Sequence, residues 1–190
     1  MPLKLITVIF FSFCAISASG QIKYGFTGGM NRSTIVIPDF TNYYITGFDV
    51  GVTAELGVSN HFYLSPQLVY ITRGTATFGT NKIRLQYLSL PLLTGYKINH
   101  HLEVLAGPTV GYLLSAIEYP LNMKDYCSSF DFGLNGTFRY RINLRSGIDL
   151  SYLYSLNGVF KAEHTVDMQN YTLPNAHNQS FQISFFYLIR

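Results

Sequence analysis

Apolar and polar residues alternate along most of this chain, and the pattern is clearest over its last residues. Residues 179–190 read Q-S-F-Q-I-S-F-F-Y-L-I-R, so that Phe181, Ile183, Phe185, Tyr187 and Ile189 share one parity. Serines and a glutamine occupy the first positions of the other parity. Because side chains alternate across a strand with a period of two, this segment is predicted to be a strand with an aromatic-rich face and a polar face.

The same alternation recurs in seven earlier segments. These strands are expected at 22–31, 46–57, 62–73, 82–98, 102–115, 130–141 and 144–156. In the third, Pro66 removes a ladder donor, which predicts a bulge or weakened pairing. In the fourth, the apolar phase changes between Tyr87 and Leu88, which predicts a β-bulge.

Nothing in the chain resembles a second layer that could cover eight apolar faces. The predicted fold is therefore all-β: a closed, eight-stranded, antiparallel, up-and-down transmembrane β-barrel. Its apolar face would meet outer-membrane lipid and its polar face would line the lumen. The last strand would close the ring by pairing with the first.

The connections between the expected strands alternate in length. Those after the second, fourth and sixth strands are short, whereas those after the first, third, fifth and seventh are longer, beginning with 32–45. Membrane barrels have short periplasmic turns and longer outer loops. An even number of strands then places both termini in the periplasm and presents four loops outside.

Threading the strands up and down places aromatic residues at two levels, as expected for rings that are apolar in the body and polar at the tip. The periplasmic girdle is predicted to contain Tyr24, Phe62, Tyr96, Tyr140 and Tyr187. The outer girdle is predicted to contain Phe48, Tyr70, Tyr112, Phe130, Tyr152 and Tyr154.

The amino-acid composition agrees with a barrel in which apolar residues are dispersed along the strands. Charged residues make up 12% of the 190 positions, about half of the roughly 25% of a typical soluble domain. No stretch after residue 20 is apolar for the ~18 residues that a membrane helix requires. The formal net charge is only +3 and no cluster of Lys and Arg occurs, which disfavours nucleic acid as a partner.

The apolar run at the N-terminus has the features of a secretory signal. Lys4 precedes an apolar region at residues 5–16, and the small residues 18–20 precede Gln21. Cleavage before Gln21 would leave a mature barrel at 21–190. A membrane anchor is the alternative, but the run is short for one. The mature chain would keep one cysteine, Cys127, so no internal disulfide could form.

Part of the fourth and fifth segments is similar to a known family. The run Y-L-S-L-P-L-L at 87–93, then G-Y-K at 95–97, Gly107-Pro108 and Gly111 resemble the PorT-like outer-membrane β-barrels of Gram-negative bacteria, and the resemblance covers nearly all of 21–190. Ser89 departs from the acidic residue usual in that family. The resemblance implies an outer-membrane location, contact with the barrel-assembly machinery, and a role with other envelope or secretion proteins.

The strand positions predicted to face the lumen include five basic and five acidic residues. The predicted lumen network comprises Lys23, Asp49, Glu55, Lys97, Glu103, Asp131, Arg139, Arg141, Arg145 and Asp149. Side chains nearly fill a lumen enclosed by eight strands, and buried charges are costly unless they are paired. We therefore expect a paired ionic interior. An ion or proton path would be the alternative, but neither sign is in excess.

Candidate catalytic and metal-binding residues do not form a recognisable motif. All five histidines fall in predicted connections. His164, Asp167 and His177 could approach a metal, and Ser155 could combine with His164 and Asp167 as a nucleophile and base, but neither spacing matches a known site. We predict no enzyme activity, no metal and no cofactor.

The leading functional hypothesis is a non-enzymatic integral outer-membrane barrel. Its outer loops would support surface secretion, envelope integrity or adhesion, because loops on a rigid scaffold carry specificity. A soluble lipocalin-like barrel that holds a small lipophile is the alternative. The two hypotheses differ in which face of the wall is apolar. A small pore is a third possibility, disfavoured by the number of strands.

Overall fold

A computed structural model describes residues 22–36, 43–76, 82–118, 121–161 and 176–189. The predicted signal segment and its cleavage site lie outside these ranges, as do His164 and Asp167. No helix within the described ranges is long and apolar enough to cross a membrane.

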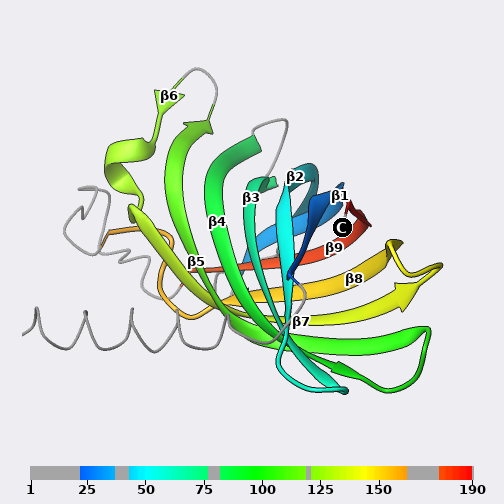
Figure 1. The fold of residues 1–190 in the computed structure, drawn as a ribbon. Helices are drawn as coiled ribbons and strands as arrows, with labels where there is room; N and C mark the ends of the chain where they lie inside the picture. Colours follow the sequence, from blue (N-terminus) through cyan, green and yellow to red (C-terminus); the bar gives the residue numbers. More distant parts are fainter. Residues whose placement is uncertain (1–21, 37–42, 77–81, 119–120, 162–175, 190) are drawn as a thin grey trace, which may run out of the picture.

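The described strands form a closed antiparallel barrel (Figure 1). They are β1 Ile22–Val36, β2 Tyr43–Gly57, β3 Phe62–Ala76, β4 Lys82–Lys97, β5 Leu102–Glu118, β6 Leu121–Asn122, β7 Phe130–Arg141, β8 Ser146–Ser155 and β9 His177–Leu188. The order around the sheet is β4-β3-β2-β1-β9-β8-β7-β5, and β4 pairs with β5 to close the ring. The two-residue β6 only extends the end of β5. The prediction of an eight-stranded up-and-down barrel is confirmed.

Short turns connect the strands at one end of the barrel, here called the turn end, and the opposite end is the loop end. The turns are residues 58–61, 98–101 and 142–145. In each, the side-chain oxygen of the second residue accepts backbone N–H groups two and three positions later; Asn99 Oδ1, for example, accepts from His101 and Leu102 at 2.8 Å. Ser59 and Asn143 do the same. These hydrogen bonds within the turn allow four residues to connect two neighbouring strands.

Both described ends of the chain lie at the turn end. The Ile189 N–H donates to the carbonyl of Tyr24, so that β1 and β9 join the first and last parts of the sequence. Their register pairs Gly28 with Phe185 and Met30 with Ile183. The expected closure of the ring by the last strand is thus observed.

Several strands extend further toward the loop end than the alternation predicts. β1 continues to Val36 and β2 begins at Tyr43, so the expectation that 32–45 forms a loop is wrong at both ends. β1 to β5 contain 15 to 17 residues, whereas β7, β8 and β9 contain 12, 10 and 12. The wall is therefore taller over β1 to β5.

The predicted phase change inside β4 is wrong. Burial alternates without a break along this strand, so Ile83, Leu85 and Tyr87 all point inward while Leu88 continues the outward row. The register shift at this level lies on the partner strand: Gln86 pairs with Ser115 and Tyr87 with Leu113. The extra residue is in β5. The sequence suggested a bulge in β4 because apolar side chains occupy both faces.

The ladder is interrupted at Pro66, as predicted. The two residues of β3 between Pro66 and Val69 have no register partner on β4. The two residues between Leu64 and Gln67, one of which is Pro66, have no register partner on β2. The register is the same on both sides of each gap. The proline therefore weakens pairing locally and does not add a residue.

The outer surface of the wall is apolar. The exposed side chains include Phe26, Met30, Leu134, Phe181 and Ile183, each more than half exposed. A soluble carrier would expose charged groups on this face and bury its apolar side chains inside. The arrangement is the one that a lipid environment requires.

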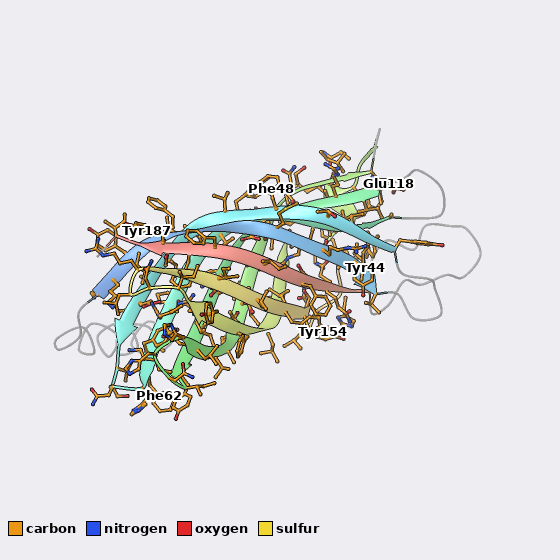
Figure 2. The ribbon with its side chains drawn as sticks, turned by 90° about the vertical axis from the view of Figure 1, so that its right-hand side faces the viewer. Tyr44, Phe48, Phe62, Glu118, Tyr154 and Tyr187 are labelled. Atoms are coloured by element: carbon orange, nitrogen blue, oxygen red, sulfur yellow. The ribbon has the colours of Figure 1, made fainter. Side chains whose placement is uncertain are left out.

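Aromatic residues gather toward both ends of this surface (Figure 2). The five residues predicted for the turn end, Tyr24, Phe62, Tyr96, Tyr140 and Tyr187, are all exposed. Toward the loop end, Phe48, Tyr112, Phe130 and Tyr152 are exposed, and Tyr70 and Tyr154 are half-buried. Neighbouring rings touch at both levels: Phe62 packs on Tyr96 with centroids 5.0 Å apart, and Tyr112 on Phe130 at 5.5 Å.

Candidate functional site

The interior of the barrel is divided along its axis into three zones. A cluster of charged residues fills the turn end, a polar cavity lies in the middle, and an apolar cluster fills the loop end. Each zone follows from the inward parity of the strands that pass through it.

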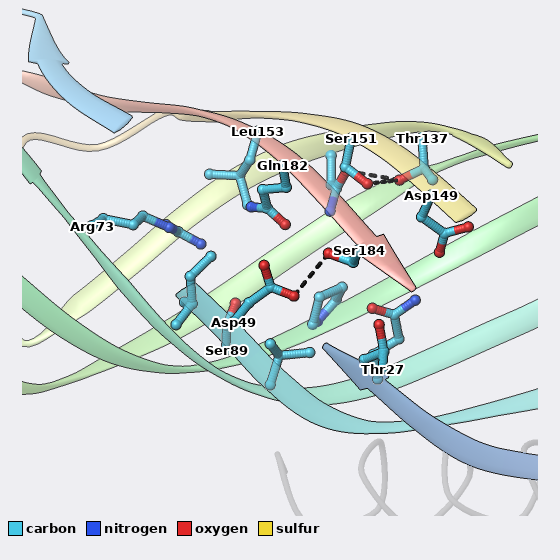
Figure 3. Close-up of a pocket in the computed structure, with 15 residues that line it drawn as sticks. Thr27, Asp49, Arg73, Ser89, Thr137, Asp149, Ser151, Leu153, Gln182 and Ser184 are labelled. Atoms are coloured by element: carbon cyan, nitrogen blue, oxygen red, sulfur yellow. Dashed lines mark hydrogen bonds between the residues drawn. The ribbon is translucent and has the colours of Figure 1, made fainter. Parts of the chain in front are cut away.

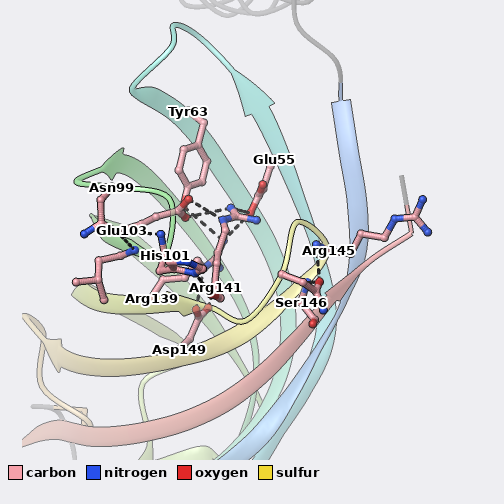
Figure 4. Close-up of polar contacts among 12 residues, drawn as sticks. Glu55, Tyr63, Asn99, His101, Glu103, Arg139, Arg141, Arg145, Ser146 and Asp149 are labelled. Carbon is pink, nitrogen blue, oxygen red and sulfur yellow. Dashed lines mark hydrogen bonds and ion pairs between the residues drawn. The ribbon is translucent and has the colours of Figure 1, made fainter.

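Arg139 is the centre of the charged cluster (Figure 4). It lies on β7 and is 1% exposed. Its Nε and Nη2 donate to the two carboxylate oxygens of Asp149, both at 2.7 Å, and its Nη1 donates to Glu55 Oε1 at 2.6 Å. The β7–β8 register places Arg139 directly opposite Asp149. Such a bidentate pair fixes the guanidinium in position.

Arg141 extends the cluster to the neighbouring strands. Its Nη2 donates to the same Glu55 oxygen at 2.6 Å, and its Nε donates to Glu103 Oε1 at 2.6 Å. The hydroxyl of Tyr63 donates to the other oxygen of Glu103. The two arginines and three carboxylates thus form one connected network, as buried charges require.

Two aromatic rings support the arginines. The guanidinium of Arg139 lies 4.1 Å from the centre of the Phe186 ring. That of Arg141 lies 5.5 Å from the same ring and 5.9 Å from the centre of the Tyr63 ring. Glycines make room for these rings. A Cβ on Gly95 would lie 2.3 Å from the Tyr63 ring, and one on Gly147 would lie 2.7 Å from the Phe186 ring. The cluster therefore depends on close approach of the rings to neighbouring backbone.

One residue predicted for the lumen network lies elsewhere. Arg145 is exposed in the turn between β7 and β8 and projects away from the cluster (Figure 4). Its placement is a correction, because the sequence began this strand at residue 144, whereas β8 begins at Ser146 and its inward parity does not include Arg145. Lys23 and Lys97 are half-buried at the turn end. Neither forms an ion pair with a described residue, although Lys97 Nζ lies 5.7 Å from the centre of the Tyr63 ring.

Three inward residues of this interior were not predicted. Arg73, 1% exposed, forms an ion pair with Asp131 at 2.8 Å. Tyr63 and Phe186 belong to the charged cluster described above. All three follow from the parity already assigned to their strands, because Tyr63 and Arg73 alternate with the outward Phe62 and Leu68, and Phe186 continues the row of polar residues in β9.

A polar cavity of about 20 Å³ lies between the charged and apolar clusters (Figure 3). Its lining includes Asp49, Arg73, Ser89, Gln182 and Ser184. Ser184 donates to Asp49 Oδ2 at 2.8 Å, whereas Asp49 Oδ1 and the Ser89 hydroxyl have no partner among the described residues. Polar space of this size holds one water molecule. A larger solute does not fit.

The loop end of the lumen is filled by apolar side chains. Ile71, Leu85, Tyr87 and Leu113 from the strands pack with residues of the loops, including Cys127. The cluster also includes Ile35, Val69, Ile83, Ala116, Val159 and Ala176. The sequence did not predict this cluster, because the interior was expected to be polar throughout.

Loop backbone completes the wall above the shorter strands β7 and β8. The N–H of Ser128 donates to Val159, and the N–H of Val159 donates to Ala176, both at 2.8 Å. Cys127 and Phe160 form an isolated β-bridge. A single 3₁₀ turn, Lys124–Tyr126, precedes this bridge. These loop segments therefore continue the sheet and hold apolar residues against the mouth of the barrel.

The described residues contain no arrangement typical of an enzyme or metal site. Ser155 is fully buried, with no hydrogen-bond partner for its hydroxyl in the described chain. The ring of His177 stacks on Tyr154 with centroids 5.7 Å apart. No group of three His, Cys, Asp or Glu in the described ranges could hold a metal ion.

Comparisons with known proteins agree with this architecture. A family model described as "Outer membrane protein beta-barrel domain" matches residues 15–161. A search of curated proteins finds no match.

Solved structures of small barrels are similar in fold. Ail, the attachment invasion locus protein of Yersinia pestis, is 12% identical, with a TM-score of 0.53 over 88% of this chain and 98% of Ail. Neisserial surface protein A is 10% identical, with a TM-score of 0.57 over 86% of this chain and 96% of that protein. At these identities the likeness shows the fold alone. The family match establishes that this chain belongs to the outer membrane β-barrel domain family, and the chain is a small outer-membrane barrel.

Proposed function

We propose that this protein is a non-enzymatic, PorT-like barrel that acts through its loop end in surface secretion, envelope integrity or adhesion. Its partners are outer-membrane lipid, the barrel-assembly machinery and other envelope or secretion proteins. Both termini lie in the periplasm, and the four loops face outward. The observation that carries the proposal is the filled interior, because a barrel that is packed at both ends offers its surfaces, and not its lumen, for interaction.

The charged cluster and the apolar cluster close the lumen in different ways. At the turn end, Arg139 and Arg141 bridge across the lumen to Glu55 on β2. At the loop end, the fully buried Leu85 and Leu113 pack against Cys127. Among the described residues, buried side chains therefore occupy the lumen at both ends.

The purified barrel is therefore expected not to conduct solutes through planar bilayers. Side chains nearly fill an eight-stranded lumen, and here they are fixed by ion pairs of 2.6–2.8 Å. Current recordings in solutions of small and large ions would test this. Steady currents that do not depend on ion size would contradict the filled interior, whereas brief bursts at high voltage would not.

The orientation of the barrel can be tested with introduced thiols. Lys124 is exposed in the 3₁₀ turn of the loop end, and Leu144, 83% exposed, lies in a turn at the opposite end. On intact cells, a large membrane-impermeant maleimide is expected to label Lys124→Cys. It should label Leu144→Cys only after the outer membrane is permeabilised.

The wild-type protein provides the control for this experiment. Cys127 is fully buried, and burial raises the pKa of its thiol to about 11. The reactive thiolate is therefore scarce at neutral pH, and the unmodified chain should remain unlabelled. Labelling of Leu144→Cys on intact cells, with Lys124→Cys protected, would show that the loops face the periplasm and would refute the proposed role.

A further inference from the structure

Three charged residues are exposed on the strands of the barrel. Of the Lys, Arg, Asp and Glu residues in the described strands, only Arg32 on β1 and Lys82 and Arg84 on β4 are exposed. All three are basic and all lie toward the loop end. We call them the rim cations.

The rim cations lie near the edge of the apolar band. Arg32 is separated from Tyr24, in the aromatic girdle of the turn end, by roughly 27 Å along β1 at about 3.4 Å per residue. With a strand tilt of about 40°, this is roughly 20 Å along the barrel axis. The same calculation places Arg84 roughly 30 Å from Tyr96. These heights bracket the upper boundary of an apolar band about 25 Å tall.

None of the rim cations takes part in an ion pair with a described residue; the ion pairs of the described chain all lie in the lumen. The half-buried Glu118 of β5 is the register partner of Ile83, which lies between the two rim cations of β4, but no ion pair joins Glu118 to either of these cations. The outward neighbour of Arg84 on β5 is the exposed Ile117. The guanidinium of Arg32 lies 5.8 Å from the centre of the Tyr44 ring, which is itself 45% exposed.

We propose that the rim cations bind anionic phosphate groups of lipid headgroups in the leaflet at the loop end. At this height the side chains leave the hydrocarbon and reach the headgroups, where long basic side chains place their charge while their stems remain on apolar surface. Arginine and lysine are the side chains that bind phosphate.

The position of the rim cations favours lipid over a water-soluble polyanion. They continue the apolar surface of β1 and β4, on which Phe26, Met30, Leu88 and Leu90 are exposed. A soluble partner would have to displace lipid to reach them. Lys82 and Arg84, two residues apart on one face, lie about 7 Å from each other along β4 and can contact neighbouring phosphates.

Electron spin resonance of spin-labelled lipids around the reconstituted barrel tests the proposal. The wild-type barrel is expected to bind spin-labelled phosphatidic acid more strongly than phosphatidylcholine. The variant with Arg32→Gln, Lys82→Gln and Arg84→Gln together should lose most of this preference. Each basic residue near an anionic surface contributes about 1 kcal/mol, so each replacement should lower the relative association constant up to about fivefold.

Arg145→Gln is the matched control, because Arg145 is an exposed arginine in a turn at the opposite end. It should leave the preference unchanged, and circular dichroism should show that all variants are folded. An unchanged preference in the triple variant would overturn the proposal, and so would an equal loss in Arg145→Gln. Displacement of the lipid by inorganic phosphate at constant ionic strength would show a site for the free anion and would also overturn it.

Discussion

Arg139→Gln is expected to destabilise the barrel by about 3–5 kcal/mol, which is the usual effect of removing one partner from a buried ion pair. Arg139 is 1% exposed and satisfies both oxygens of Asp149 as well as one oxygen of Glu55. In the variant, the Asp149 carboxylate loses its ion-pair partner. Glu55 keeps only its bond from Arg141. Reversible unfolding by denaturant in lipid vesicles would measure the change.

Arg145→Gln is the control for this experiment. Both arginines were assigned to the lumen from the sequence, but the structure places only Arg139 inside. An exposed turn residue away from special contacts should change the free energy of unfolding by no more than about 0.5 kcal/mol. Equal losses in the two variants would contradict the structural assignment, and so would a negligible effect of Arg139→Gln.

The strand count and the two faces of the wall could be predicted because they depend on local geometry. Successive side chains of a strand point to opposite faces whatever the strand pairs with. Phe181, Ile183 and Phe185 are therefore exposed in β9, and Ser180 and Ser184 are buried, as the alternation indicated. The turns were predictable for a similar reason, since Asn99 and Asn143 form their hydrogen bonds within the turns themselves.

Strand ends were less predictable, and the errors in the predicted lumen network follow from them. The parity rule applies only while the chain remains extended. Arg145 was assigned inward by continuing the parity of a strand into a turn. Arg73 was placed at the very end of its predicted strand, yet β3 continues to Ala76, so this guanidinium is buried against Asp131.

The apolar cluster at the loop end could not be predicted from periodicity. In β4, both Leu85 and Leu88 are apolar, yet one is buried and the other is 40% exposed. At the loop end of β4, the face that is buried depends on the register with the neighbouring strands. It also depends on loop residues such as Cys127, which pack over the mouth of the barrel. These are contacts between distant parts of the chain, and no local pattern encodes them.

The two faces of β8 can be compared directly at neighbouring positions. Leu150 is 50% exposed and lies between Phe138 of β7 and Ile183 of β9, which are also exposed. Ser151 points the other way, lines the polar cavity, and its hydroxyl lies 2.8 Å from that of Thr137. The same substitution at these two positions therefore places a charge in two different environments.

Leu150→Arg is expected to lower the free energy of unfolding by about 2–4 kcal/mol, because it places a charge near the middle of the bilayer. Ser151→Arg places the same charge in the lumen, where its effect comes from crowding and from the charges of Arg139 and Asp149. A thicker bilayer lengthens the path from Leu150→Arg to water, whereas the lumen is unchanged. The measurement is reversible unfolding of both variants in bilayers of two thicknesses. The penalty of Leu150→Arg should grow with thickness and that of Ser151→Arg should not; equal responses, or a larger response from Ser151→Arg, would mean that Leu150 does not face lipid.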